Sequence, residues 1–368
     1  MNLIKLAKAL NLSISTVSKA LRDSHEISET TKNKVLAKAK ELKYHANPFA
    51  SSLRKQKSKT IAIVIPEIVN NFFGLAINGI ESVAQEKGYH ILIYLTHEQV
   101  QKEIAITNLL QNGRVDGIMI SISSQTIDTS HFKELMEKDI PLVFFDRVAE
   151  NIDAPRVTTN DYESGLMATE HLLEKGCKRI GYISTSSTLP ICKNRMNGYL
   201  DALTKNGIEQ DENLIVHCGN DEGENKVLIR DLLKQKNRLD AIFSAVEKQA
   251  ITCYEICEEL KLDIPGDLKI ISFSNLRSAS FLNPSMTTIT QPAFEIGREA
   301  TSILFKIIEK KPLSLILDKT IFKSELIERN STKVKAHTEL LSPRDYYHWF
   351  NKQNKEIFQI AGFIFLSL

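Results

Sequence analysis

Short apolar runs alternate with amphipathic stretches along the chain from about residue 60 onward. A continuous apolar run such as Ile61–Ile65 is typical of a strand buried on both faces of a parallel sheet, and the stretches between runs have helical periodicity. The expected strands are residues 61–65, 89–94, 117–120, 142–147, 179–183, 214–217, 241–243 and 269–273, with a first helix at about 74–87. The series restarts near residue 179, which predicts an α/β body of two doubly wound parallel-sheet subdomains. Because such sheets bind ligands beyond the carboxyl ends of their strands, we expect a ligand site in the cleft between the two halves.

The first 45 residues instead show the pattern of three short helices. The apolar face of the first helix consists of Leu3, Leu6, Ala7 and Leu10. Asn2 can cap this helix, and Asn11 suits its end because asparagine tolerates a left-handed backbone. Ser13 can cap the second helix, with its apolar side at Val17, Ala20 and Leu21. Two helices joined in this way form a helix-turn-helix, whose second helix enters the DNA major groove.

A third helix is expected to begin after a cap at Ser28. Its buried residues should be Val35, Leu36, Ala39 and Leu42, and its solvated residues Lys32, Lys34, Lys38, Lys40 and Lys43. Capped amphipathic helices also build three-helix bundles that bind no DNA, so this pattern alone leaves both interpretations open.

The charge distribution favours the DNA-binding interpretation. Residues 1–60 contain 13 Lys and Arg against 4 Asp and Glu, although the whole chain has a net charge of only +2. A basic head joined to a mildly acidic body is typical of a nucleic-acid-binding module fused to a second domain.

The segment after the third helix predicts a connector of low stability. Asn47 followed by Pro48 is an N-cap with a first-turn proline, which starts a short helix. That helix has few apolar residues, so it should be marginal by itself and could form only when docked on DNA.

The opening through Lys59 resembles the lactose, purine and galactose repressor family (LacI/GalR), in which TVSxxL and NxxAxxL motifs occur at the spacing of Thr16–Leu21 and Asn47–Leu53. The resemblance implies a homodimer on a near-palindromic double-stranded operator. Its hinge helices would enter the minor groove, where Leu53 wedges between base steps and Asn47 and Ala50 line the groove. Family position and helix geometry imply that Ile14, Ser15 and Lys19 read bases and that Lys5, Ser13, Thr16 and Ser18 hold phosphates. Ile14 suits contact with a thymine methyl group.

The resemblance extends to about Arg329. Its markers are Asn70–Phe73, Phe145–Arg147, Ala168–Leu172, Arg195–Tyr199 and Pro284–Pro292. It implies a periplasmic-binding-protein-like body in which the chain crosses between subdomains three times. The predicted division is a helix-turn-helix domain at 1–46, a hinge at 47–58, an effector-binding and dimerisation body at 59–332, and a C-terminal extension at 333–368. One subdomain is expected at 60–158 plus 289–312, and the other at 159–288 plus 313–332.

Family pocket positions imply an effector site. They are occupied by Phe73, Asp146, Asn160, Arg195, Val246, Ser274 and Gln291. A carboxylate at Asp146 and a guanidinium at Arg195 could share the hydroxyl groups of a small polar ligand. The alternative is that these two residues form an ion pair between the subdomains without contacting any ligand.

Two departures from the family pattern leave the effector unnamed. Val246–Glu247 stands where the family usually has Asn-Asp, and Ser274–Asn275 where it often has Asp-Asp. Because valine cannot hydrogen-bond a sugar, the effector could be another sugar or sugar derivative, a phosphorylated metabolite, or a protein.

The sequence disfavours two other function classes. An enzyme built on the body is disfavoured, because the chain has no GxGxxG opening a helix, no P-loop and no GxSxG. A sugar-binding protein with an incidental basic head is disfavoured by the absence of a secretory signal. The five cysteines form no CxxC pair, so we expect neither metal nor cofactor but buried thiols in a cytoplasmic protein without a membrane partner. Residues 333–368 lie beyond the resemblance and are assigned no function.

Overall fold

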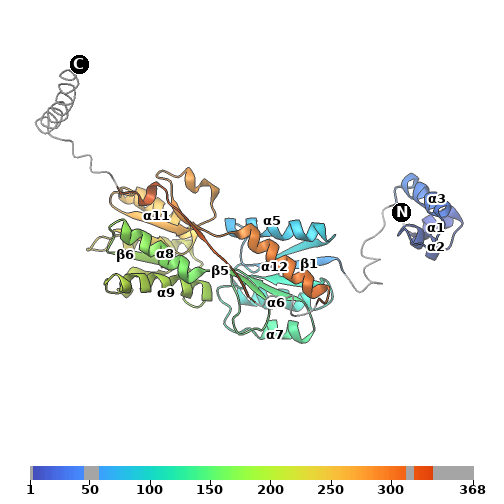
Figure 1. Cartoon of the computed structure of the whole chain (residues 1–368), viewed down its shortest axis with the longest axis horizontal. Coiled ribbons are helices and arrows are strands. Elements are labelled where there is room, and N and C mark those ends of the chain that lie inside the picture. The colour runs from blue at the N-terminus through green and yellow to red at the C-terminus, as the bar shows by residue number, and fades with distance from the viewer. Residues whose placement is uncertain (1–2, 45–57, 312–318, 335–368) are drawn as a thin grey trace, which may run out of the picture. The chain divides into compact units, whose positions relative to one another are not determined.

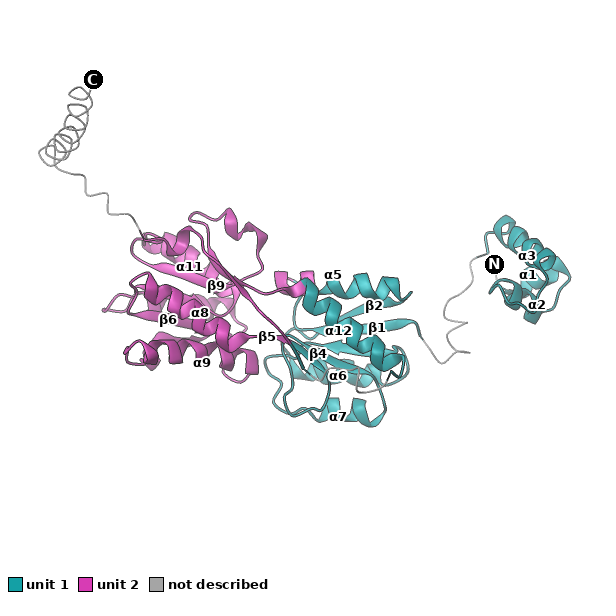
Figure 2. Cartoon of the chain, in the orientation of Figure 1, with its two compact units in different colours: residues 1–68, 76–157, 294–320 teal, residues 69–75, 158–293, 321–368 magenta. Residues whose placement is uncertain are grey.

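The computed structural model describes residues 3–44, 58–311 and 319–334. The chain forms two compact units, shown in Figure 2. Unit 1 contains Met1–Ile68, Ala76–Val157 and Phe294–Thr320, and unit 2 contains Val69–Leu75, Thr158–Ala293 and Ile321–Leu368. Within the described residues, no helix has the length and apolar character needed to cross a membrane.

The N-terminal head consists of three helices, α1 (Leu3–Leu10), α2 (Ile14–Ala20) and α3 (Glu29–Glu41), as Figure 1 shows. Their shared core consists of Leu6, Ala7, Leu10, Val17, Ala20, Val35 and Ala39. The three helices predicted from the sequence are therefore confirmed, while the cap expected at Asn2 lies outside the described residues.

For two side chains of α3 the sequence predicts the wrong environment. Leu36 was expected in the core but is 50% exposed, because the buried stripe runs through Val35 and Ala39 and Leu36 is turned away from it. Lys32 was expected in solvent but is buried. Its ammonium group forms ion pairs with Asp23 (2.6 Å) and Glu29 (2.7 Å), which hold the side chain against the head.

The first sheet has the strand order β11-β5-β4-β3-β1-β2. Its strands are β1 (Thr60–Ile65), β2 (His90–Leu95), β3 (Gly117–Ile120), β4 (Leu142–Phe145), β5 (Arg156–Thr159) and β11 (Lys319–Phe322). The helices that follow in the chain are α5 (Asn71–Glu86), α6 (Val100–Leu110), α7 (Ser130–Glu137) and α12 (Ala293–Ile308). From β1 the chain steps to β2 on one side and then to β3 on the other, all in parallel. Right-handed crossovers therefore place α5 and α6 on opposite faces of the sheet.

The second sheet repeats this plan in the order β12-β10-β9-β8-β6-β7. Its strands are β6 (Ile180–Ser184), β7 (Ile215–His217), β8 (Ala241–Ser244), β9 (Lys269–Phe273), β10 (Thr287–Thr290) and β12 (Glu325–Ile327). Its helices are α8 (Asp161–Glu174), α9 (Pro190–Lys205), α10 (Glu222–Leu233) and α11 (Glu247–Leu260), with short 3-10 turns η1 (Glu212–Leu214), η2 (Arg277–Ser280) and η4 (Asn330–Thr332). Only β12 is antiparallel to its neighbour among the pairings described in this sheet. The α/β fold with two parallel-sheet subdomains is confirmed.

All eight strands expected from apolar runs are present, with two kinds of difference. β4 ends at Phe145 instead of residue 147, because Asp146 has a positive φ of 60° and turns the chain out of the sheet. β5 and β10 were not predicted, because both are short and rich in threonine. β10 keeps the chain in the second sheet as far as Thr290, although the chain was predicted to return to the first subdomain at residue 289. β11 belongs to the first sheet, although residues from 313 onward were predicted in the second subdomain.

The cysteines predicted to be buried thiols are all free and buried. Burial raises the pKa of Cys177 and of Cys218 to about 11, so both thiols are protonated at neutral pH. They act as small apolar side chains, which agrees with the prediction.

Close contact between α8 and α9 depends on glycine in unit 2. A Cβ atom placed on Gly165 would lie 2.3 Å from the carbonyl oxygen of Arg195, and one on Gly198 would lie 2.2 Å from that of Tyr162. Each helix can therefore approach the backbone of the other only where it has no side chain.

We predict that Gly165→Ala destabilises unit 2 by about 1–3 kcal/mol, because the added methyl group must push two helix backbones apart. Gly74 in α5 provides a matched control, since a Cβ there meets nothing within 4 Å. Gly74→Ala should be neutral or stabilise by roughly 0.5–1 kcal/mol. Urea unfolding followed by circular dichroism measures both, and equal stability of the two variants would contradict the prediction.

Candidate DNA-binding and effector-binding sites

The start of helix α2 is held in place by its cap. Asn11 adopts the left-handed conformation expected of it, with φ 54°. The Ser13 hydroxyl accepts a hydrogen bond from the Thr16 amide at 3.0 Å and lies 2.8 Å from the Thr16 hydroxyl. Both side chains therefore fix the turn between α1 and α2, a task the sequence predicted for Ser13 alone.

The outward surface of α2 carries the residues predicted to meet DNA. Ile14 is 45% exposed although it is apolar, and Ser15 is exposed beside it. Lys5 is exposed on α1, and Ser18 is partly exposed on α2. An apolar side chain left exposed between small polar ones fits the edge of a base pair, where a thymine methyl group can cover it.

Lys19 has a partner that the sequence did not predict. Its ammonium group forms an ion pair with Glu26, which follows α2. The hydrogen bond and the charge of Lys19 lower the pKa of Glu26, so the pair persists at neutral pH. Any contact of Lys19 with DNA competes with this carboxylate for the ammonium group. The hinge residues Asn47, Ala50 and Leu53 lie outside the described residues.

A second group of polar side chains lies where the strands of unit 2 end. We define the carboxyl edge of unit 2 as the residues that follow β8, β9 and β10, namely Val246–Glu247, Ser274–Asn275 and Gln291. In a doubly wound sheet this edge is the ligand-binding edge. The predicted site residues Val246, Ser274 and Gln291 belong to it.

Arg195 reaches this edge from α9. Its Nε donates to Asp161 Oδ1 at 2.8 Å, and its Nη1 donates to the Ala245 carbonyl oxygen at 2.7 Å. The guanidinium lies 3.6 Å from the centre of the Phe273 ring. Its third nitrogen, Nη2, is buried without a hydrogen-bond partner among the described residues. An unpaired buried donor costs about 1–3 kcal/mol, so Nη2 is a candidate for contact with a ligand.

Glu247 organises the rest of the edge. Its Oε1 accepts from the Asn71 side chain at 2.6 Å, and its Oε2 accepts from the Ser274 hydroxyl at 2.6 Å and the Asn275 amide at 3.1 Å. The sequence flagged Glu247 only as a departure from the family pattern. Asn71 stands in the Asn70–Phe73 marker, but the sequence did not indicate its contact with Glu247, which lies 176 positions away and is reached only in the folded chain.

The other predicted residues of unit 2 have structural partners. The side-chain amide nitrogen of Gln291 donates to Thr159 Oγ1 at 3.0 Å. Asn160 Oδ1 accepts from the Ser164 hydroxyl at 3.0 Å and from the Ser324 amide at 2.8 Å, so its side chain joins α8 to the last segment of the unit. Phe73 is 1% exposed and packs edge-on against the neighbouring Phe72 ring.

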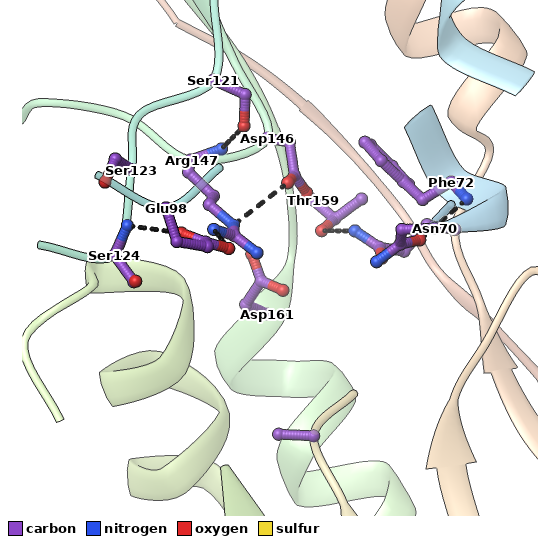
Figure 3. A network of polar contacts seen from close by, with 12 residues as sticks. Asn70, Phe72, Glu98, Ser121, Ser123, Ser124, Asp146, Arg147, Thr159 and Asp161 are labelled. Carbon is purple, nitrogen blue, oxygen red and sulfur yellow. Dashed lines mark hydrogen bonds and ion pairs between the residues drawn. The ribbon is translucent and has the colours of Figure 1, made fainter. Parts of the chain in front are cut away.

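Asp146 lies at the corresponding strand end of unit 1, shown in Figure 3. It follows β4 with φ 60° and is 4.0 Å from Arg147 Nε, and Arg147 Nη1 donates to Glu98 at 2.7 Å. Burial would raise the pKa of Glu98, but the charge of Arg147 and hydrogen bonds from Arg147 and Ser124 outweigh it and lower that pKa. Arg147 and Glu98 were not predicted, although Arg147 stands in the Phe-Asp-Arg marker.

Two family models match separate parts of the chain. Residues 3–47 match the model of bacterial regulatory proteins of the lacI family, and residues 169–332 match the periplasmic binding protein-like domain. The ribose operon repressor of Halalkalibacterium halodurans is 32% identical over 335 residues, covering 91% of this chain and 98% of the relative.

Solved structures show the same fold. A lac repressor dimer bound to operator and an anti-inducer aligns with a TM-score of 0.78 at 18% identity, covering 91% of this chain and 99% of that one. A complex of the transcriptional regulator CelR with cellobiose aligns with a TM-score of 0.68 at 22% identity, covering 90% and 99%. The chain therefore belongs to the LacI family of bacterial transcription regulators, which are DNA-binding proteins and not enzymes.

Proposed function

We propose that this chain is a repressor that binds a near-palindromic operator through α2 and the hinge segment at 47–58. The exposed face of α2, with Ile14 beside Ser15, is the observation that carries the proposal. The bases would be read by Ile14, Ser15 and Lys19, and phosphates would be held by Lys5, Ser13, Thr16 and Ser18. Because the proposed target is chromosomal DNA, the protein would act in the cytoplasm.

The operator would be bound by a homodimer, as the lac repressor dimer of the solved complex binds its own. Two head domains on two half-sites require two chains. Strand β2 offers a surface for pairing. It is the edge strand of its sheet, and Leu92 and Ile93 are 42% and 39% exposed on it. Exposed apolar edge strands are pairing sites unless a partner covers them.

The body would bind a sugar or sugar derivative at the carboxyl edge of unit 2. The unpaired Arg195 Nη2 supports this proposal, as do two relatives: a ribose operon repressor and a regulator bound to cellobiose. Such a ligand can change operator affinity only if it binds the DNA-bound and the DNA-free arrangements of the dimer with different affinities. The difference between these two affinities sets the size of the change.

The proposed activity is tested by selection from random DNA duplexes with the purified full chain. Recovery of a near-palindromic sequence, bound more than about a thousandfold tighter than random competitor, is expected of a specific regulator. A reporter gene behind that sequence should then be repressed. Equal binding to all duplexes would refute the proposal.

Releasing Lys19 should strengthen DNA binding. In Glu26→Gln the ion pair is lost, and the head also loses one negative charge, so operator affinity should rise by roughly threefold or more at low salt. Glu41→Gln is the matched control, because it frees Lys38 on α3 instead. Fluorescence anisotropy measures both, and an equal gain in the two variants would remove the special role of the Lys19–Glu26 pair.

Charge on the β2 edge should break the dimer. Leu92→Glu puts a carboxylate into the proposed interface, which should shift the protein towards monomers and weaken operator binding with it. Ile127→Glu is the control, because Ile127 is 80% exposed in the loop before α7. Sedimentation velocity measures both species, and a dimeric Leu92→Glu protein would refute this interface.

Arg195→Lys should abolish the response to the effector and leave operator affinity unchanged. The single ammonium group of lysine cannot serve Asp161, Ala245 and a ligand together. Arg179→Lys is the control, because Arg179 precedes β6 at the opposite edge of the sheet and pairs with Asp211. Operator binding with and without ribose, cellobiose or adenosine measures the response. A normal response in Arg195→Lys would refute the site.

A further inference from the structure

We infer that the carboxyl edge of unit 2 selects a neutral sugar, free or within a nucleoside, and rejects its phosphorylated form. This inference rests on the proposed function and names the ligand class of the same site. It is carried by the hydrogen-bonding capacity left unused at this edge and by the charges around it.

The unused capacity is one donor and one acceptor. The donor is Arg195 Nη2, and the acceptor is the side-chain oxygen of Asn275; both atoms are buried without a partner among the described residues. The orientation of the Asn275 amide is fixed, because its nitrogen donates to the Gln291 carbonyl oxygen at 2.7 Å. A carbonyl can only accept, so the Asn275 oxygen must be the group left over.

A hydroxyl group matches both of these atoms. It donates to an amide oxygen and accepts from a guanidinium, and adjacent hydroxyls of a sugar offer both functions side by side. A phosphoryl group at neutral pH is chiefly an acceptor, so one placed against these two atoms would leave the Asn275 oxygen buried and unpaired.

The donors that could hold a phosphate are already occupied. The Asn71 side chain, the Ser274 hydroxyl and the Asn275 backbone amide all donate to the Glu247 carboxylate. Glu247 therefore fills with its own two oxygens the place where an anion would find hydrogen-bond donors.

The charges lead to the same conclusion. Arg195 supplies a positive charge at this edge. Its Nε lies 2.8 Å from Asp161 Oδ1, and this carboxylate neutralises it. Glu247 adds a second carboxylate at this edge, so the formal charges of Arg195, Asp161 and Glu247 sum to −1. A phosphate ester brings about −1.5 to −2 charges, which this net negative charge repels in a partly buried site.

The experiment is calorimetric titration of the full chain with three matched pairs: ribose and its phosphate ester, cellobiose and its phosphate ester, and adenosine and adenosine monophosphate. The neutral member of at least one pair should bind at least about tenfold tighter than its phosphorylated partner. The adenosine pair separates a nucleoside from a free sugar. A phosphorylated member that binds equally well or better overturns the inference, as does the failure of every neutral member to bind at millimolar concentration.

Two variants assign the effect to its residues. Asn275→Ala removes the unused acceptor and should weaken the neutral ligand by about tenfold. Its control is Asn220→Ala, an exposed asparagine of the same unit. Glu247→Gln removes the excess charge and should narrow the gap between the neutral and the phosphorylated ligand. Its control is Glu258→Gln, on the exposed side of the same helix. An unchanged gap in Glu247→Gln overturns the electrostatic cause.

Binding to the selected operator, measured on the same preparations, separates the two proposals. Sequence-selective DNA binding together with a preference for phosphate esters overturns only the ligand class. If the unmodified chain binds no DNA sequence selectively, the proposed function itself is overturned.

Discussion

Burial of the Arg195 guanidinium is the constraint on which the second unit is built. Arg195 is only 5% exposed, so its guanidinium must be neutralised and hydrogen-bonded. Asp161 of α8 and the carbonyl that follows β8 do so, with the Phe273 ring of β9 beneath the guanidinium. One side chain thus ties two helices to two strands. Removing a partner would leave an uncompensated buried charge. This would destabilise the fold by far more than a surface ion pair stabilises it.

The same constraint explains why α8 and α9 lie so close together. The arginine sits on α9 and its carboxylate at the start of α8, so the helices must approach within the length of these side chains. Gly165 and Gly198 allow that approach, since a Cβ atom on either would overlap the backbone of the other helix. Packing and electrostatics therefore require each other in this unit. The arrangement leaves one guanidinium nitrogen buried without a hydrogen-bond partner among the described residues.

Charge is handled differently at the two candidate sites. In the head, Lys19 and Glu26 lie at the surface, where an ion pair contributes little and a phosphate can displace the carboxylate. At the carboxyl edge of unit 2, Glu247 is held by three hydrogen bonds and is not displaced without leaving its donors unpaired. In the proposals made above, Glu26 competes with DNA for the Lys19 ammonium group, whereas Glu247 occupies the donors that an anionic ligand would need.

Local pattern determined much of this protein. Apolar runs placed all eight expected strands, Ser13 and Ser28 marked two helix starts, and Asn11 marked a left-handed turn, because each of these features depends on neighbouring residues alone. The pattern failed where side chains meet across the fold. Lys32 is buried by its ion pairs, Asp161 was not recognised as the partner of Arg195, and Asn71 meets Glu247 from 176 positions away. Only the tertiary structure decides such contacts, since hydrogen bonds and charges act over a few ångströms of space whatever the separation along the chain.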